Sequence, residues 1–379
     1  MERTFAQGGL TGRSLVAGNL LFSVARGEDD ADIRRLFREN ALSGWVRLSL
    51  EREPAAFDAD FGLSRSHAFI IARDHATAAV IGICERSVRD AFVDGEIRPL
   101  PYLGSLRVAP AHRHRIRVLR GGFAAVRELL GEPSDLPFAL TSITADNETA
   151  RRVLCSGLPG LPTYRPVGEL STFAIRTTLK DTPRGVEQAT PDDIAAIAVL
   201  LQRSYCRFQF APVWTAADLR QLIAAGGLRS EDFLVVRRGP GVCACLAVWD
   251  QSIAKQTVVR GYAPWLGRLR PLVNLAAPLT GMPWLPPPGS PLTQVYLSHV
   301  AVENDDPAVF QSLLTAGLAL ARRRGFDVAL TGFASAHPFA TLLQGRRAAI
   351  YRSLLHTVHW QDDDAALAPR LPHVEIAVL

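Results

Sequence analysis

Short apolar runs separated by polar turns dominate the first 150 residues of the chain. Strands are predicted at 69–74, 79–84, 102–108 and 138–143. Between the third and fourth of these, an amphipathic stretch at 111–130 has the apolar spacing of a helix, and Gly131 supplies a stop signal. The predicted order is therefore strand, strand, strand, helix and strand.

The same order recurs in the second half of the chain. Strands are predicted there at 233–238, 242–248, 295–302 and 328–333, with a helix at 307–324 that ends before Gly325. Each half also begins with a short strand, an acidic cap and a helix, over 24–40 and 186–205. The tripeptide Ala-Leu-Thr occurs at the same step of both halves, at 139–141 and 329–331. Five elements repeated in one order indicate an internal duplication.

We interpret this duplication as two domains in tandem, because 379 residues suffice for two separate cores. The predicted boundaries are a lead-in at 1–21, a first domain at 22–178, a polar linker at 179–185 and a second domain at 186–379. The second domain carries an insertion at about 251–293 that is rich in Trp, Pro and Gly. A segment this long without strong periodicity is usually functional or mobile, so we expect a lid, a docking surface or packing between the halves.

Composition argues against several classes of protein. Hydrophobic residues make up 48% of the chain and charged residues 21%, which is ordinary for a globular protein. No segment offers the roughly 18 uninterrupted apolar residues of a membrane span, and we find no secretory signal. The net charge of +5 is dispersed, without the basic stripe and interleaved aromatic residues of a nucleic-acid surface.

The cysteines and lysines add two further constraints. Cysteines at 84, 155, 206, 243 and 245 lack the spacing of a disulfide framework or of a metal site. An odd number of thiols favours a reducing compartment, so we expect a cytoplasmic protein without a metal ion. Of the 42 basic residues only two are lysines, Lys180 and Lys255. We interpret this arginine bias as the mark of a GC-rich bacterial genome.

The junction between the strand at 102–108 and the helix at 111–130 carries the densest chemistry. Pro110 and Arg113 precede further basic residues, which continue into the start of the helix. A helix N-terminus offers unpaired backbone N–H groups and the positive end of the helix dipole, and arginine adds charge-assisted hydrogen bonds. This segment is therefore suited to an anionic pyrophosphate such as that of coenzyme A.

These residues resemble the GNAT superfamily of acyl-CoA-dependent N-acyltransferases. The family signature Val-x-Pro-x-x-Arg is met by Val108, Pro110 and Arg113. Ile116 and Val118 occupy the two positions at which the signature continues with glycines. Glycine lets the backbone approach a phosphate closely, and a β-branched side chain can obstruct that approach.

A later family signature, Asn-x-x-Ala-x-x-Leu-Tyr followed by Gly, is also present in part. It is met by Asn147, Ala150, Val153 and Gly157. Leu154 stands at the position of the tyrosine that often protonates the departing thiolate in the family, and leucine cannot do so. The resemblance therefore implies the fold and the cofactor site, but not the usual acid.

The resemblance implies an α/β (α+β) fold of two GNAT-like domains in tandem, each a mixed, mostly antiparallel sheet flanked by helices. It further implies transfer of an acyl group, acetyl by default, from acetyl-CoA or another acyl-CoA to an amine of a small molecule or protein. The residues expected to hold the acyl-CoA are Leu106, Arg107, Val108, Arg113, His114, Arg115, Ile116, Arg117, Val118 and Asn147.

Candidates for proton transfer are few. An acceptor that arrives as an ammonium must lose a proton before it attacks, and Glu85, at the end of a central strand, is the first candidate base. Tyr102 is the second candidate, and Glu96 is a further option. Each of the three could also be a solvated or structural residue. We interpret His299 and His337 of the second half as structural.

The second half lacks a basic loop. Its corresponding loop reads Glu-Asn-Asp-Asp at 303–306, and acidic residues there would repel a pyrophosphate. We therefore expect one acyl-CoA site, in the first half. Two other functions fit the sequence: a non-catalytic binding or regulatory protein of this fold, and an acyltransferase whose donor is an acyl carrier protein. An acidic carrier would suit the arginine-rich loop and the Trp/Pro-rich insertion.

Overall fold

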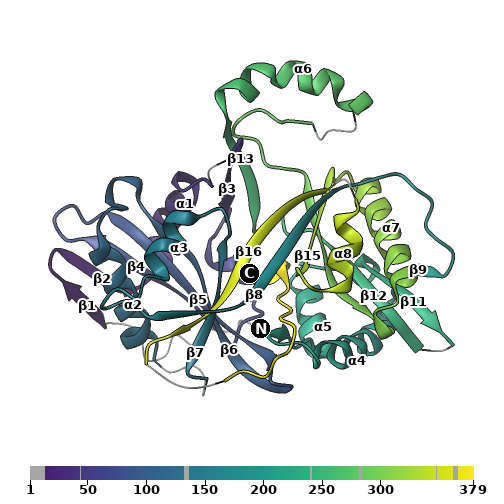
Figure 1. Cartoon of the computed structure of the whole chain (residues 1–379), viewed down its shortest axis with the longest axis horizontal. Helices are drawn as coiled ribbons and strands as arrows, with labels where there is room; N and C mark the ends of the chain where they lie inside the picture. The colour runs from purple at the N-terminus through teal and green to yellow at the C-terminus, as the bar shows by residue number, and fades with distance from the viewer. Residues whose placement is uncertain are drawn as a thin grey trace.

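The computed structural model describes residues 13–42, 44–131, 136–239, 241–280, 284–346, 348–361 and 366–379. Within these residues, fourteen strands form one continuous sheet and two more form a small separate sheet (Figure 1). Residues 1–12 of the predicted lead-in lie outside the described part. Residues 14–17, also in the lead-in, form a strand that pairs with its successor.

The first half contains the strands β1 (Ser14–Ala17), β2 (Leu20–Val24), β3 (Val46–Glu51), β4 (Ser66–Asp74), β5 (Val80–Val93), β6 (Glu96–Val108), β7 (Phe138–Thr144) and β8 (Thr163–Arg176). The second half contains β9 (Val186–Gln188), β10 (Ala211–Pro212), β11 (Phe233–Arg238), β12 (Gly241–Trp249), β13 (Gln256–Tyr262), β14 (Gln294–Val302), β15 (Val328–Ala334) and β16 (Ala348–His359). The α-helices are α1 (Asp30–Glu39), α2 (Ile116–Leu130), α3 (Glu148–Leu154), α4 (Ile194–Tyr205), α5 (Ala216–Ala224), α6 (Pro264–Thr280), α7 (Pro307–Arg323) and α8 (Pro338–Gln344).

The order of the strands repeats between the two halves, as the duplication predicted. In the first half β2, β4, β5, β6 and β7 lie side by side, and in the second half β9, β11, β12, β14 and β15 lie in the same order. All of these neighbours are antiparallel except β6 with β7 and β14 with β15, which are parallel. The predicted mixed, mostly antiparallel α/β architecture is confirmed.

The two halves exchange their last strands. β8, the last strand of the first half, pairs with β15 of the second half. β16, the last strand of the second half, pairs with β7 of the first half. β8 and β16 also pair with each other, and they cross the centre of the molecule (Figure 1). Each half therefore completes its sheet with a strand from the other.

Helices cover both faces of the sheet because its strands carry apolar side chains on both faces. Phe69 and Ile71 of β4 pack in the core beneath α1, whereas Ile70 and Ala72 pack in the core beneath α2. Successive side chains of a strand point to opposite faces, so the two helices lie on opposite sides of the sheet. In the second half, α4 and α7 pack against β12 in the positions that correspond to α1 and α2.

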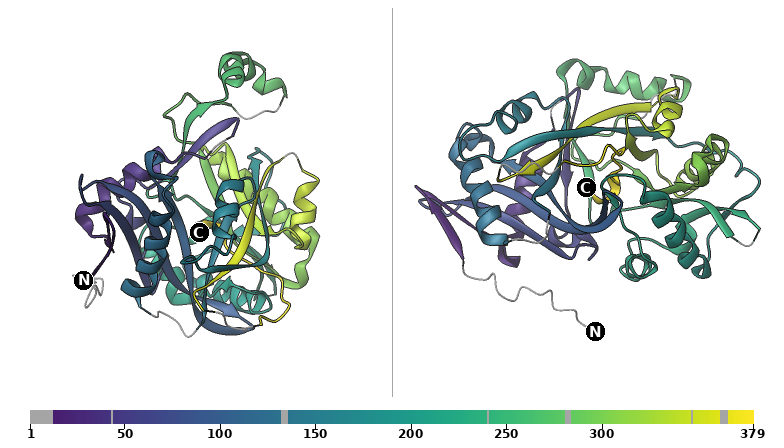
Figure 2. Two further views of the ribbon diagram at one scale, coloured as in Figure 1. Left: turned by 60° about the vertical axis from the view of Figure 1, so that its left-hand side comes forward. Right: turned by 60° about the horizontal axis from the view of Figure 1, so that its bottom comes forward.

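The predicted insertion crosses from the second half to the first. Its strand β13 pairs with β3 to form the small sheet, and the Gln256 side chain bonds both backbone groups of Glu53. Helix α6 follows and projects from the body of the molecule (Figures 1 and 2). Its Trp265 is 50% exposed and Leu275 is 78% exposed. The ring of Trp265 packs edge-on against Trp45, which follows the first half's α1.

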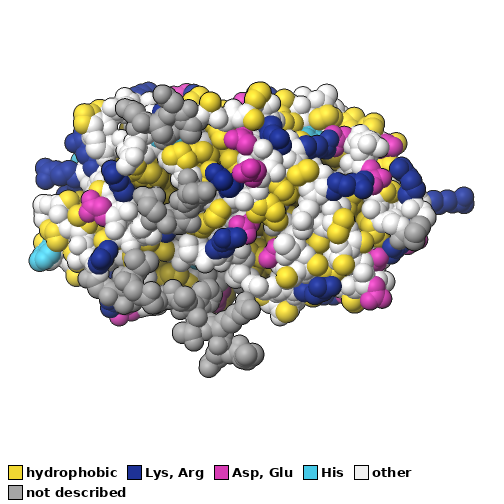
Figure 3. All heavy atoms as spheres, turned by 90° about the horizontal axis from the view of Figure 1, so that it is seen from below, with side chains coloured by type: hydrophobic (Ala, Val, Ile, Leu, Met, Phe, Trp, Pro, Cys, Tyr) yellow, Lys and Arg dark blue, Asp and Glu magenta, His cyan; other side chains and the backbone are white. Residues whose placement is uncertain are grey.

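Charged side chains of both signs are mixed on one face of the molecule, and the cysteines are not cross-linked. On the face seen from below, basic and acidic side chains are interspersed (Figure 3). All five cysteines are free thiols. In the described ranges, no helix has the length and apolar character needed to cross a membrane.

Candidate functional site

The parallel strands β6 and β7 border the main cavity of the first half. Their pairing joins Tyr102 to Leu140 and Leu103 to Thr141. A cavity of about 400 Å³ opens against these strands. Its walls include residues of β3, β5, β6, β7, β8 and α3 from the first half and of β14, β15 and β16 from the second. Residues 255–257 of the insertion and the C-terminal Ile376, Val378 and Leu379 complete them. Both halves therefore contribute to one cavity, and the last residues of the chain lie at the centre of the molecule (Figure 2).

A β-bulge shapes the wall formed by β5 and β6. The register of the two strands shifts between Ile83 and Glu85, and Ser105 opposite adopts a left-handed backbone conformation with φ 52°. A bulge leaves one residue outside the ladder and redirects its side chain. Here it brings the Ser105 hydroxyl to Glu85, and the backbone on either side faces the cavity.

Glu85 lies at the centre of a charged network in the cavity wall. Arg52 binds its carboxylate with both terminal nitrogens, at 2.8 and 2.6 Å. His67 contacts the same carboxylate at 2.6 Å, and Ser105 donates to it at 2.6 Å. Burial alone would raise the pKa of Glu85, but Arg52 and the hydrogen bond from His67 outweigh burial and hold it well below its usual value. A carboxylate bound in this way is a weak proton acceptor.

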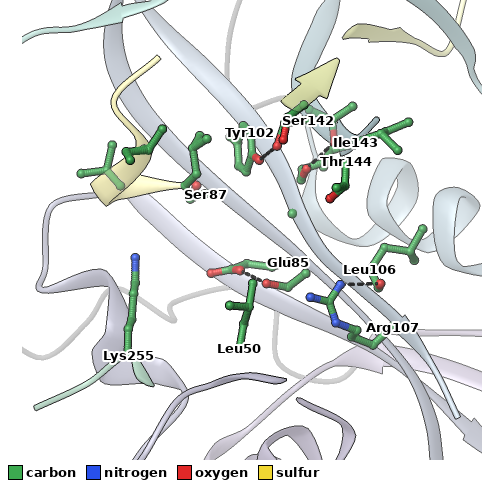
Figure 4. Close-up of a pocket in the computed structure, with 18 of the residues that line it drawn as sticks. Leu50, Glu85, Ser87, Tyr102, Leu106, Arg107, Ser142, Ile143, Thr144 and Lys255 are labelled. Carbon is green, nitrogen blue, oxygen red and sulfur yellow. Dashed lines mark hydrogen bonds between the residues drawn. The ribbon is translucent and has the colours of Figure 1, made fainter. Parts of the chain in front are cut away.

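Tyr102 faces the same cavity from β6. Its hydroxyl lies 2.7 Å from the hydroxyl of Ser142 on β7, so it bridges the two parallel strands (Figure 4). Burial raises the pKa of Tyr102 to about 12, and the charge of Glu85 adds to this effect. The phenol is therefore neutral at physiological pH and can donate a hydrogen bond, but it does not readily release its proton.

Two basic side chains line the cavity on either side of Glu85, Arg107 from β6 and Lys255 from the insertion (Figure 4). Arg107 donates to the backbone oxygen of Leu106 at 3.0 Å. Burial lowers the pKa of Arg107, and the neighbouring charge of Arg52 lowers it further. The strand thus presents a positive charge at the end of the cavity next to the predicted cofactor loop.

The arginines of the predicted pyrophosphate loop lie on the surface just before α2. Arg113 donates to Asn40 at 2.9 Å, which ties the loop to the end of α1. Arg115 lies 3.8 Å from Asp74 of β4. Arg117 in the first turn of α2 is exposed, as is His114 in the loop. These basic side chains surround the N-terminus of α2, as the sequence predicted from their spacing.

The two residues at the glycine positions point away from this surface to different degrees. Val118 is buried and packs on Gly82 of β5, where an added methyl group would come within 3.1 Å of it. Ile116 is half-buried at the first position of α2. A cavity of about 20 Å³ between β6 and α2 is lined by residues that include Leu106, Val108 and Val118. The Val118 side chain therefore belongs to the core and leaves the outer face of the turn open.

Asn147 is the cap of α3 and also lines the main cavity. Its side-chain oxygen accepts a hydrogen bond from the backbone N–H of Ala150 at 3.1 Å. Leu154 ends the same helix and is buried. The helix thus presents its capped N-terminus and its apolar face to the cavity, and no acid replaces the family tyrosine at Leu154.

The corresponding region of the second half is filled. The bulge recurs between β12 and β14, and His299, at the position equivalent to Ser105, again has φ 52°. His299 is fully buried, and its ring packs against Trp214 and Trp249. Its backbone N–H donates to Glu375 at 2.9 Å. Aromatic rings and a carboxyl group therefore occupy the space that opens as a cavity in the first half.

The N-terminus of α7 is likewise occupied by the protein's own groups. Asp306 accepts hydrogen bonds from Ala308 and Val309 at 2.8 and 3.3 Å. Glu303 and Asp305 are ion-paired with arginines of the α4 region. A helix N-terminus capped by its own carboxylate has no free donors for an external anion. His337 plays a similar capping role at α8, where it accepts from Phe339.

No protein-family model matches the sequence, and no curated protein matches it significantly. Solved structures do match. Saccharomyces cerevisiae N-myristoyltransferase with bound myristoyl-CoA superposes with a TM-score of 0.60 at 13% identity, over 96% of this chain and 90% of that one. A GCN5-related N-acetyltransferase from Sphaerobacter thermophilus gives 0.54 at 13% identity, over 96% of this chain and all of the other. The chain has a tandem GNAT fold. Identities this low establish the fold alone.

Of the predicted site residues, Glu85, Tyr102, Leu106, Arg107 and Asn147 line the cavity, but four other side chains of the cavity were missed. Arg52, His67, Ser105 and Lys255 line or support the cavity without any motif in the sequence. One signal was available for Lys255, because lysine is so rare in this chain that its use within the insertion called for a reason. In the described residues, no group of histidine, cysteine and carboxylate side chains is arranged to hold a metal ion.

Proposed function

We propose that the protein is an N-acyltransferase that uses an acyl-CoA donor bound by its first half. The observation that carries this proposal is the cavity between β6, β7 and α3, which opens beside a basic helix N-terminus in the first half only. The arginines around α2 would hold the pyrophosphate. The strand Leu106–Val108 would pair with the pantetheine arm, and Asn147 would orient the cofactor or its own helix.

The acceptor in this proposal is an amine that enters from the side of the insertion. The nitrogen of the neutral amine attacks the thioester carbonyl carbon, the C–S bond breaks, and the departing thiolate takes the proton that the nitrogen loses. The Tyr102 hydroxyl can donate a hydrogen bond to a group in the cavity. Glu85 was the first candidate base, but we assign it a positioning role, because its carboxylate is already held by Arg52, His67 and Ser105.

An acyl carrier protein is a second candidate donor, and α6 is the observation that favours it. From 264 to 276 the helix carries arginines at 268 and 270 and no acidic residue, and it exposes a stripe of large apolar side chains. Such a surface fits an acidic helical partner. Activity with carrier-bound acyl groups, but not with acyl-CoA, would favour this donor.

Calorimetric titration with acetyl-CoA and a longer acyl-CoA tests the first proposal. We expect binding near one equivalent, and we expect Arg113→Ala and Arg117→Ala each to weaken it by about tenfold, the worth of a charge-assisted hydrogen bond. Arg184→Ala, at an exposed arginine of the linker, is the matched control. Absence of binding to both thioesters would reject acyl-CoA as the donor and leave the carrier-protein and non-catalytic alternatives.

A further inference from the structure

Lys255 belongs to the second half of the chain, and its side chain lines the cavity that contains the predicted site of the first half. It lies directly before β13, whose pairing with β3 fixes the backbone above the cavity, and its side chain extends inward (Figure 4). The Nζ atom donates to the backbone oxygen of Ala377 at 3.4 Å. The nearby carboxylates do not neutralise the charge of Lys255, because Glu85 is bound by Arg52 and Asp60 is bound by Arg89.

The charge state of this amine follows from its surroundings. Burial lowers the pKa of Lys255 to about 7, and the positive charges of Arg52 and Arg89 add to the effect. Glu85 and Asp60 oppose the shift without cancelling it. At mildly alkaline pH the side chain is therefore mostly a neutral amine, which has a free electron pair.

The same cavity holds the residues expected to bind the thioester. Leu106, Arg107 and Asn147 line it together with Lys255. A nucleophile confined in one cavity with its electrophile reacts as if at very high concentration. The lysine is thus in the position of an internal acceptor whenever the cavity holds a donor and no substrate amine.

We propose that Lys255 is a self-acylation site, to which an acyl-CoA bound in the cavity transfers its acyl group. This inference rests on the proposed function. The Nζ electron pair attacks the thioester carbonyl carbon, a C–N bond forms and the C–S bond breaks. The departing thiolate takes the proton that the nitrogen loses. The products are an N-acyl-lysine amide and free coenzyme A, and no further reactant is needed.

Acylation would change the cavity in two ways. The amide is uncharged and cannot accept a proton, whereas the free amine is suited to take one from an incoming ammonium. The acyl group would also fill part of a cavity of about 400 Å³. We therefore expect acylated protein to be less active toward external amines than unmodified protein.

Mass spectrometry of the full chain tests the proposal without knowledge of the acceptor. The protein is incubated with acetyl-CoA or octanoyl-CoA in an amine-free buffer, and the modified peptides are mapped. Lys180 is exposed and is the only other lysine, so it is an internal control for ordinary chemical acylation. We expect Lys255 to react about tenfold or more faster than Lys180, given the confinement of donor and amine. Its rate should rise with pH through about 7.

Variants separate the outcomes. Lys255→Arg should abolish the specific modification, Lys180→Arg should leave it unchanged, and Arg113→Ala should slow it in proportion to the lost affinity for acyl-CoA. Equal modification of both lysines, or an unmodified Lys255 when calorimetry shows that acyl-CoA is bound, would overturn this inference and leave the transferase proposal intact. Failure to bind either thioester would overturn both.

Discussion

The buried pair of Arg52 and Glu85 shows how single residues set the chemistry of the cavity. Their side chains are only 10% and 13% exposed, and two further hydrogen bonds saturate the carboxylate. A buried charge without its partner is costly, because it keeps the desolvation penalty and loses the attraction that offsets it. Glu85 therefore holds Arg52 in place, and it prevents an unpaired positive charge at the centre of the site.

Glu85→Gln should destabilise the protein at neutral pH by about 3–5 kcal/mol, because Arg52 loses its buried partner. The folded-state pKa of Glu85 lies below its unfolded value, so its contribution is complete above about pH 4.3 and is lost as pH falls through the folded-state pKa. Urea unfolding at neutral and acidic pH measures both effects. The variant should therefore lose less of its free energy of unfolding than the wild type does when the pH is lowered.

Glu96→Gln is the matched control, since the Glu96 side chain is 75% exposed and lies on the neighbouring strand. It should change the free energy of unfolding by no more than about 0.5 kcal/mol. A Glu85→Gln variant as stable as the wild type, with the same response to acid, would show that Glu85 is not held by Arg52 in solution.

At the scale of elements, the first turn of α2 combines a surface role with a core role. Its outer face carries Arg117, next to Arg113 of the preceding loop, whereas Val118 on the inner face packs on Gly82. The helix therefore keeps its register on the sheet even though the glycines of the GNAT signature are absent. The equivalent helix α7 keeps the packing but closes its N-terminus with Asp306. One element thus serves as a binding loop in one half and as a capped structural helix in the other.

Val118→Gly should destabilise the protein by about 3 kcal/mol, through the cavity left on Gly82 and the cost of glycine in a helix. Ile116→Gly, at the half-buried first position, should cost only about 1 kcal/mol. Thermal or urea denaturation of the two variants compares them directly. Equal losses would contradict the assignment of Val118 to the core.

At the scale of the whole molecule, the exchange of β8 and β16 joins the halves into one sheet. The last strand of each predicted domain, β8 of 22–178 and β16 of 186–379, has both of its neighbours in the other half. The cavity depends on the same arrangement, because β13 and the C-terminal residues reach it from the second half. The duplication therefore produces one site from two repeats.

Separate fragments 1–178 and 179–379 should not fold alone, because each would expose an unpaired edge at β7 or β15 and an unpaired last strand. We expect neither fragment to unfold cooperatively in circular dichroism, whereas co-expressed fragments should elute together in size-exclusion chromatography. A cooperative thermal transition for fragment 1–178 by itself would show that the exchanged strand is dispensable.

Much of this architecture was readable in the sequence. The strands, the helices and their repeated order follow from apolar spacing, because burial of one face imposes a local period on each element. The basic loop before α2 and the Asn147 cap are also local features, since the groups that interact lie within a few positions of each other. The acidic loop at 303–306 belongs to the same class, because its sequence alone distinguishes it from the basic loop of the first half.

Only the tertiary structure decided which distant segments meet. Arg52 and Glu85 are 33 positions apart, and β13 pairs with a strand that lies some two hundred positions earlier. The exchange of the last strands has no local signature, because β8 and β16 would show the same apolar pattern beside either partner. The charge of Lys255 depends on burial and on two arginines distant in sequence, Arg52 and Arg89. Such properties arise from long-range packing, so they become visible only when the whole chain is folded.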